Sequence, residues 1–295
     1  MNPAIPFAVA CLGIATFAIM DGVMKGLSID LGVYNAIFWR MLIGLSLASL
    51  LFIWKRPAWP TRSVLHLHIW RGCVMALTAF LFFWSIARIP LAEAVALSFI
   101  APLIALYLAA VMLNESINRN AVIASLLGLA GSMVVISGSL GGEYSDDTLL
   151  GVVAVLVSAG LYGYNLILQR QQALLANPIE ITFFQNLTIA TLFLVLAPFL
   201  AIPPPAEQLP FLASAAVLAV FSSLLLAWAY ARAEAKVLIP VEYTAFIWVA
   251  IYGWFVFDEA VTLTTYVGTA LIVIGCLIAT RQNQNPPQHI ESTAV

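Results

Sequence analysis

Polar and aromatic side chains occur inside long apolar stretches of this sequence, at positions that repeat with a spacing of 144 residues. The pairs are Thr78 and Ser222, Ser98 and Glu242, Phe99 and Tyr243, and Asp21 and Asn165. Hydroxyls, a carboxylate and an amide can hydrogen-bond a zwitterion, and aromatic rings can pack on its side chain or its ammonium group. We therefore expect these residues, together with Tyr162, to line one central binding cavity. The alternative is that the hydroxyls only satisfy backbone carbonyls or pack between helices.

Glu242 is the carboxylate with the most specific prediction. It lies inside an apolar segment, roughly 8 Å of helical rise from the segment's end. A carboxylate inside a membrane helix is costly, and it usually faces a cavity or a partner. Glu242 could bind a substrate ammonium group or carry a coupling proton. The alternative is that it stays near the membrane interface and pairs with a basic residue.

Other charged residues and prolines also fall within apolar segments. Asp21 and Lys25 are four residues apart, so they share a helix face and can neutralise each other, or they can gate the substrate. Arg40 and Arg71 are expected to reach an interface or a carboxylate, because arginine side chains snorkel.

Pro102 removes a hydrogen bond from its helix, so we expect a kink that flexes during the functional cycle. Pro240 predicts a similar kink near the start of its own segment.

The elements that must position these residues form an internal repeat. Trp84–Gly131 and Trp228–Gly275 align without a gap, and the matches at rare residues carry the signal. These matches are Trp84 with Trp228, Arg88 with Arg232, Glu115 with Glu259, and Gly131 with Gly275. Glu115 and Glu259 are expected to fix the turn into the following helix. Small residues at helical spacing, such as Ala124 and Gly128, predict close packing between helices.

The composition indicates the class of protein. Of the 295 residues 63% are hydrophobic and only 9% are charged, whereas an ordinary soluble domain carries about 25% charged residues. The sequence therefore predicts an all-α integral membrane protein. Its ten transmembrane helices are expected at roughly 5–26, 33–54, 67–88, 91–113, 120–139, 148–169, 179–200, 209–231, 237–257 and 262–280. The three cysteines are isolated in apolar segments, and we expect no metal, no cofactor and no nucleic-acid partner.

Charge and repeat together predict the topology. Most of the lysines and arginines at loop ends fall on the side that would carry both termini, which places the termini in the cytoplasm. Each half holds five helices, so the second half must enter the membrane from the opposite side. We therefore predict two inverted five-helix repeats, at 1–141 and 142–281, followed by a disordered cytoplasmic tail at 282–295. Binding sites in such inverted repeats lie near the midplane, between the two halves.

These residues and spacings resemble the drug/metabolite transporter superfamily, and within it the EamA-type bacterial permeases. Glu115, Ala124 and Gly131 in the first half, and Glu259, Gly268 and Gly275 in the second, carry the resemblance, and Arg40 also looks like the family's pattern. The resemblance implies a ten-helix secondary transporter in the bacterial inner membrane. It implies export of small organic metabolites such as amino acids, including aromatic ones, by alternating access. The monomer or a homodimer would be the working unit.

Two other classes remain as alternatives. An intramembrane enzyme would need a convergent catalytic set, whereas the histidines at 66, 68 and 289 lie at a helix entrance and in the tail. A channel for a small solute would need a filter, and no ring-forming filter motif is evident.

Overall fold

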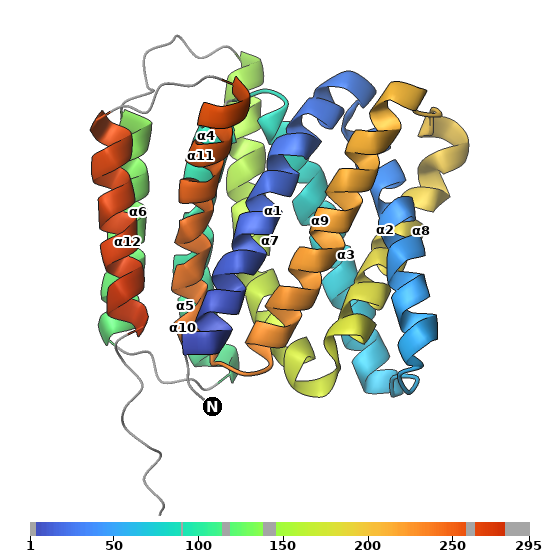
Figure 1. The fold of residues 1–295 in the computed structure, drawn as a ribbon, viewed down its shortest axis with the longest axis horizontal. Helices are drawn as coiled ribbons and strands as arrows, with labels where there is room; N and C mark the ends of the chain where they lie inside the picture. The colour runs from blue at the N-terminus through green and yellow to red at the C-terminus, as the bar shows by residue number, and fades with distance from the viewer. Residues whose placement is uncertain (1–3, 90, 114–118, 138–145, 258–262, 281–295) are drawn as a thin grey trace, which may run out of the picture.

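The computed structural model describes residues 4–89, 91–113, 119–137, 146–257 and 263–280, and every regular element in these ranges is helical (Figure 1). The first half comprises α1 (Ala4–Leu31), α2 (Val33–Lys55), α3 (Arg62–Ile86), α4 (Leu91–Ser98), α5 (Ile100–Leu113) and α6 (Arg119–Ser137). The second half comprises α7 (Asp146–Leu175), α8 (Pro178–Leu200), η1 (Ala206–Gln208), α9 (Leu209–Tyr230), α10 (Ala235–Leu238), η2 (Ile239–Thr244), α11 (Ala245–Phe257) and α12 (Leu263–Thr280). The predictions for Glu115, Glu259 and the tail at 282–295 fall outside the described residues.

Six of these helices are long and apolar enough to cross a bilayer: α1, α2, α3, α7, α8, and α9 together with η1. Shorter apolar helices include α5 and segments of α6 and α12. Large apolar side chains are exposed on the outer surface, among them Trp54, Phe199 and Leu263. Exposed surface of this kind suits contact with lipid. The chain is therefore an all-helical, multi-pass membrane protein.

The fourth and ninth expected spans differ from single continuous helices. Phe99 separates α4 from α5, and the ninth span starts as the short α10 and the 3₁₀ helix η2 before α11 continues it. Pro102 explains the first interruption, because its ring would clash with the carbonyl of Ser98 in a continuous helix. In the first turn of α5 the missing N–H costs little. The kink expected at Pro102 is thus a break three residues earlier.

The ends of α3 and α9 have the same local structure, 144 residues apart. The Arg88 guanidinium lies 3.5 Å from the ring centroid of Trp84, and that of Arg232 lies 4.1 Å from the ring of Trp228. Each arginine also donates to the carbonyl of its tryptophan, at 3.0 and 3.1 Å. The rare residues that align in the sequence therefore make equivalent contacts.

The packing of the helices follows the same correspondence. Helix α1 packs on α9 and α3 on α7, while α2 packs on α8 and α6 on α12. Figure 1 shows that α1 begins at the end of the bundle where the N-terminus lies, and that α7 ends there. A Cβ added at Gly275 of α12 would lie 2.9 Å from the carbonyl oxygen of Ala124 in α6. The small residues thus let α6 and α12 approach closely within one chain.

Replacing Gly128 by valine is expected to destabilise the fold. A Cβ at Gly128 would lie 2.4 Å from the ring of Tyr243, a buried side chain, and overpacking of this kind costs about 1–3 kcal/mol. Thermal unfolding of the purified variant measures the loss. Gly160→Val is the matched control, because a Cβ at Gly160 meets nothing within 4 Å. Equal melting temperatures for the two variants would contradict this packing.

Candidate functional site

A central cavity with a volume of about 150 Å³ lies between the two halves. Helices α1, α2, α3, α4 and α5 contribute to its wall, as do α7, α8, α9, η2 and α11. Its apolar lining is rich in aromatic and methionine side chains, which include Phe17, Met20, Met41, Met75, Phe82 and Phe83. Such a lining, with a few polar groups, is typical of a site for a small organic molecule.

Most of the residues expected at the site reach this cavity. Its wall includes Asp21, Thr78, Ser98, Phe99, Pro102, Tyr162, Asn165, Ser222 and Glu242. The exceptions are Tyr243, whose ring contacts that of Phe99, and Lys25, which donates from Nζ to the carbonyl of Ile89 at 3.3 Å.

Phe99 and Tyr243 are in direct contact. Their ring centroids are 5.0 Å apart, and the Tyr243 hydroxyl donates to the carbonyl of Phe99 at 3.2 Å. The two residues occupy corresponding positions, 144 residues apart, in the two halves. Corresponding positions can touch only near an axis that relates the halves, so this contact is where a two-fold axis would pass. Both residues follow the side chains expected to bind, Ser98 and Glu242.

The hydroxyls of the site already donate to backbone carbonyls. Thr78 donates to Val74 and Ser98 to Ala94, each at 2.8 Å and within its own helix. Ser222 of α9 donates across to Gly13 of α1, also at 2.8 Å. The bonds to backbone carbonyls, which were the alternative expectation for these hydroxyls, are therefore present. Their lone pairs can still accept from an ammonium group, but binding of an anion must come from other residues.

Glu242 borders the cavity. Its side chain lies in η2, is 6% exposed, and accepts a hydrogen bond from the Tyr162 hydroxyl at 2.9 Å. The phenol supplies one hydrogen bond but no positive charge. A buried carboxylate of this kind can bind a cationic group or a proton.

Asp21 and Arg40 place an acid and a base on the same cavity wall. Both side chains border the cavity, and the two residues are 6% and 5% exposed. Within the described residues, Asp21 Oδ1 and Arg40 Nε make no hydrogen bond. Asp21 and Lys25 are predicted to neutralise each other or to gate the substrate; the structure bonds Lys25 to the carbonyl of Ile89 and places Arg40 on the same cavity wall as Asp21. Unbonded buried polar atoms are costly unless a ligand or water satisfies them.

Arg71, which is expected to reach an interface or a carboxylate, lies buried and bonds to amides. It is 4% exposed, and its three guanidinium nitrogens donate to amide oxygens of Asn165, Gln169 and Gln172 at 2.9, 3.0 and 2.6 Å. These amides follow one another at spacings of four and three residues, so they share one face of α7. This row of amides on an apolar helix was the signal in the sequence.

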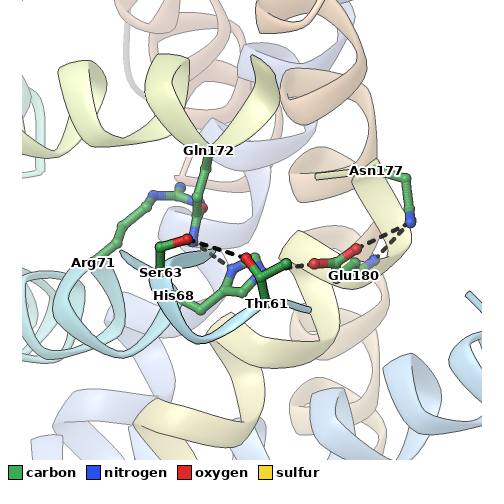
Figure 2. A network of polar contacts seen from close by, with 7 residues as sticks. All are labelled: Thr61, Ser63, His68, Arg71, Gln172, Asn177 and Glu180. Atoms are coloured by element: carbon green, nitrogen blue, oxygen red, sulfur yellow. Dashed lines mark hydrogen bonds and ion pairs between the residues drawn. The ribbon is translucent and has the colours of Figure 1, made fainter. Parts of the chain in front are cut away.

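A chain of polar contacts continues from Arg71 to the end of the bundle (Figure 2). Gln172 Nε2 contacts His68 Nδ1 at 2.7 Å, and His68 Nε2 contacts Glu180 Oε1 at 3.1 Å. Glu180 in turn contacts Asn177, the residue that caps α8. We call Arg71, Gln172, His68 and Glu180 the polar relay. The sequence does not predict this relay, because its members come from three helices.

No group of three or more potential metal ligands occurs in the part of the chain that the structure describes.

Comparisons with known proteins agree with this architecture. The EamA-like transporter family matches twice, at residues 5–137 and 149–281, so the two matches begin 144 residues apart. The chain is 26% identical to the pseudopaline exporter CntI of Pseudomonas aeruginosa, over 92% of this chain and 94% of that protein. It is 24% identical to a riboflavin transporter of Brucella anthropi, over 83% and 87% of the two chains. A solved crystal structure shares the fold with a TM-score of 0.76 at 17% identity, over 94% and 97% of the two chains. The chain belongs to the EamA-like transporter family, as the resemblance to drug/metabolite permeases indicated.

Proposed function

We propose that this protein is a secondary transporter that exports small zwitterionic metabolites, amino acids first among them, by alternating access around the central cavity. The observation that carries the proposal is the pair Asp21 and Arg40, an acid and a base that border one cavity with unbonded polar atoms. An amino acid offers the complementary charges, an ammonium and a carboxylate. The relatives named for pseudopaline and riboflavin support an organic solute in general.

Each part of an amino acid has a place in this cavity. Asp21 and Glu242 accept from the ammonium group, with the lone pairs of Ser98 as additional acceptors. Arg40 donates to the carboxylate, because the hydroxyl protons are already used. The rings of Phe82, Phe83 and Phe99 line the remaining space, which favours an aromatic side chain. An intramembrane enzyme or a channel remains the alternative.

The proposal includes the arrangement of the repeats. Residues 1–141 and 142–281 form inverted units of five spans each, with α4–α5 and α10–η2–α11 as the interrupted fourth and ninth spans. The recurring bonds at Trp84 and Trp228 support this arrangement. Interrupted helices at the centre of inverted repeats are typical of secondary transporters. Both termini lie in the cytoplasm of a bacterium, and the protein acts in the inner membrane as a monomer or homodimer.

Proteoliposomes with the purified protein test the function. Vesicles loaded with one unlabelled amino acid at a time are expected to take up the same labelled amino acid by counterflow, fastest for aromatic ones. A channel would conduct the solute without counterflow. Absence of counterflow for all twenty amino acids would overturn the proposal for this substrate class.

The Tyr162→Phe variant is expected to transport about tenfold more slowly, because the hydrogen bond to the buried Glu242 carboxylate is lost. Initial rates of counterflow measure the effect. Tyr164→Phe is the matched control on the same helix, since the Tyr164 hydroxyl accepts from Trp70 at an exposed position. Equal rates for the two variants would show that the bond between Tyr162 and Glu242 plays no part in transport.

A further inference from the structure

The cavity holds a second pair of opposite charges, distinct from Asp21 and Arg40. Arg71 lies about 14 Å along α3 from the helix start, at the end of the bundle where the N-terminus lies, whereas Arg40 lies about 10 Å from the opposite end. Arg71 bonds to Asn165, and Glu242 bonds to Tyr162. Asn165 and Tyr162 are three residues apart on α7, so they are neighbours on that helix. Arg71 and Glu242 therefore flank the same stretch of the wall.

Among the residues that the structure describes, no acid forms an ion pair with Arg71. Its three partners are neutral amides. Amides satisfy its hydrogen bonds, but they do not offset the cost of removing a full charge from water. A carboxylate would bind the planar guanidinium more strongly, through two charge-assisted bonds. Because Arg71, Asn165 and Gln169 border the cavity, a solute can reach this position.

The hydrogen bonds of the polar relay run in one direction. Gln172 Oε1 accepts from Arg71, so its Nε2, which can only donate, faces Nδ1 of His68. His68 Nδ1 must then accept, and its Nε2 carries the proton donated to Glu180. The order of donors is therefore Arg71, Gln172, His68. The relay joins α3 to α7 and α8 (Figure 2), at the end of the bundle where α1 begins and α7 ends (Figure 1).

We propose that Arg71 and Glu242 form a second subsite for a zwitterionic solute. The polar relay holds α3, α7 and α8 together at this end of the cavity and so acts as a latch, and capture of the solute's carboxylate by Arg71 releases it. Arg71 leaves Gln172 when it turns to the carboxylate, and Gln172 then has no fixed orientation toward His68. The contact of α7 with α3 and α8 loosens as a result. This inference rests on the proposed function, because it assumes a solute that carries both charges.

Hydrogen exchange of the purified protein in nanodiscs tests the latch. Three probes are added separately: a mixture of the twenty L-amino acids, a mixture of primary alkylamines and aralkylamines without carboxylates, and a mixture of acetate, succinate and citrate. We expect the amino acids to raise amide exchange around His68 and Glu180 about tenfold, the size of a lost hydrogen bond to a charged group. The amines should leave exchange unchanged, because they cannot bind Arg71.

Variants at Gln172 show whether the rise in amide exchange depends on the bond between Arg71 and Gln172 or is a general effect of the solute on the helices. Gln172→Glu supplies Arg71 with a permanent carboxylate of similar size, so the response to amino acids should disappear. Gln172→Leu should show fast exchange without any probe. Gln171→Glu, the neighbouring and half-exposed glutamine, is the matched control and should respond like the parent protein. An unchanged response in Gln172→Glu, or slow basal exchange in Gln172→Leu, would overturn the latch.

The probes also separate this inference from the proposed function. A response to the organic acids but not to amino acids would show that Arg71 captures a carboxylate without an ammonium group at Glu242, which overturns the zwitterion subsite. Counterflow of amino acids without any change in exchange would support the transport function and overturn the latch.

Discussion

Transport by the Glu242→Gln variant is expected to fall about 10- to 100-fold, the range for loss of a hydrogen bond to a charged group. The glutamine keeps the size of the side chain and can still accept from Tyr162, whose hydroxyl lies 2.9 Å away. It cannot attract an ammonium group and cannot carry a proton. Any acceleration of transport by an imposed proton gradient should therefore disappear as well. Counterflow at several pH values, with and without the gradient, measures both effects.

The control for Glu242 is a glutamate outside the cavity. Glu207 lies exposed in η1, so Glu207→Gln should transport like the parent protein at every pH. Normal transport by Glu242→Gln at all pH values would exclude both substrate binding and proton coupling for this carboxylate. A loss of counterflow with the gradient response intact would assign Glu242 to the substrate alone.

The helical spans were predictable because lipid leaves few alternatives. Backbone groups inside a bilayer must be bonded within their own segment, so long apolar runs such as 33–54 and 179–200 form helices. The repeat was detectable because tryptophan, arginine and glutamate are rare in such a chain. The recurring contact of Arg88 with Trp84, and of Arg232 with Trp228, shows that the aligned tryptophans and arginines also have equivalent structures.

The direction in which a side chain faces was harder to predict. Most of the helices are apolar on all sides, so no polar stripe distinguishes the lipid face from the cavity face. The depth of Arg40 and Arg71 could be counted along the sequence, but their rotation about the helix axis could not. The partners of Arg71 lie about 100 residues away on α7, and only tertiary packing brings them together. The break at Phe99 depends on Pro102, which the sequence offered as a kink.

Neutralising either member of the pair Asp21 and Arg40 is expected to destabilise the protein as well as stop transport. Arg40→Gln removes the basic side chain that shares the cavity wall with the buried Asp21 carboxyl group, and the loss is bounded by the cost of breaking a buried ion pair, about 3–5 kcal/mol. Asp21→Asn has the converse effect on Arg40. Thermal unfolding in detergent measures the loss. Asp30→Asn is the control on the same helix, because Asp30 is exposed and bonds to Gln208 at the surface.

The double variant Asp21→Asn/Arg40→Gln distinguishes folding from binding. Both replacements are neutral, so no buried charge is left unmatched, and the melting temperature should rise above that of either single variant. Counterflow should remain at least about tenfold below the parent rate, since an amide pair binds an ammonium and a carboxylate more weakly than opposite charges do. Recovery of both stability and transport in the double variant would show that the pair only holds α1 to α2. The zwitterion site would then have to lie elsewhere in the cavity.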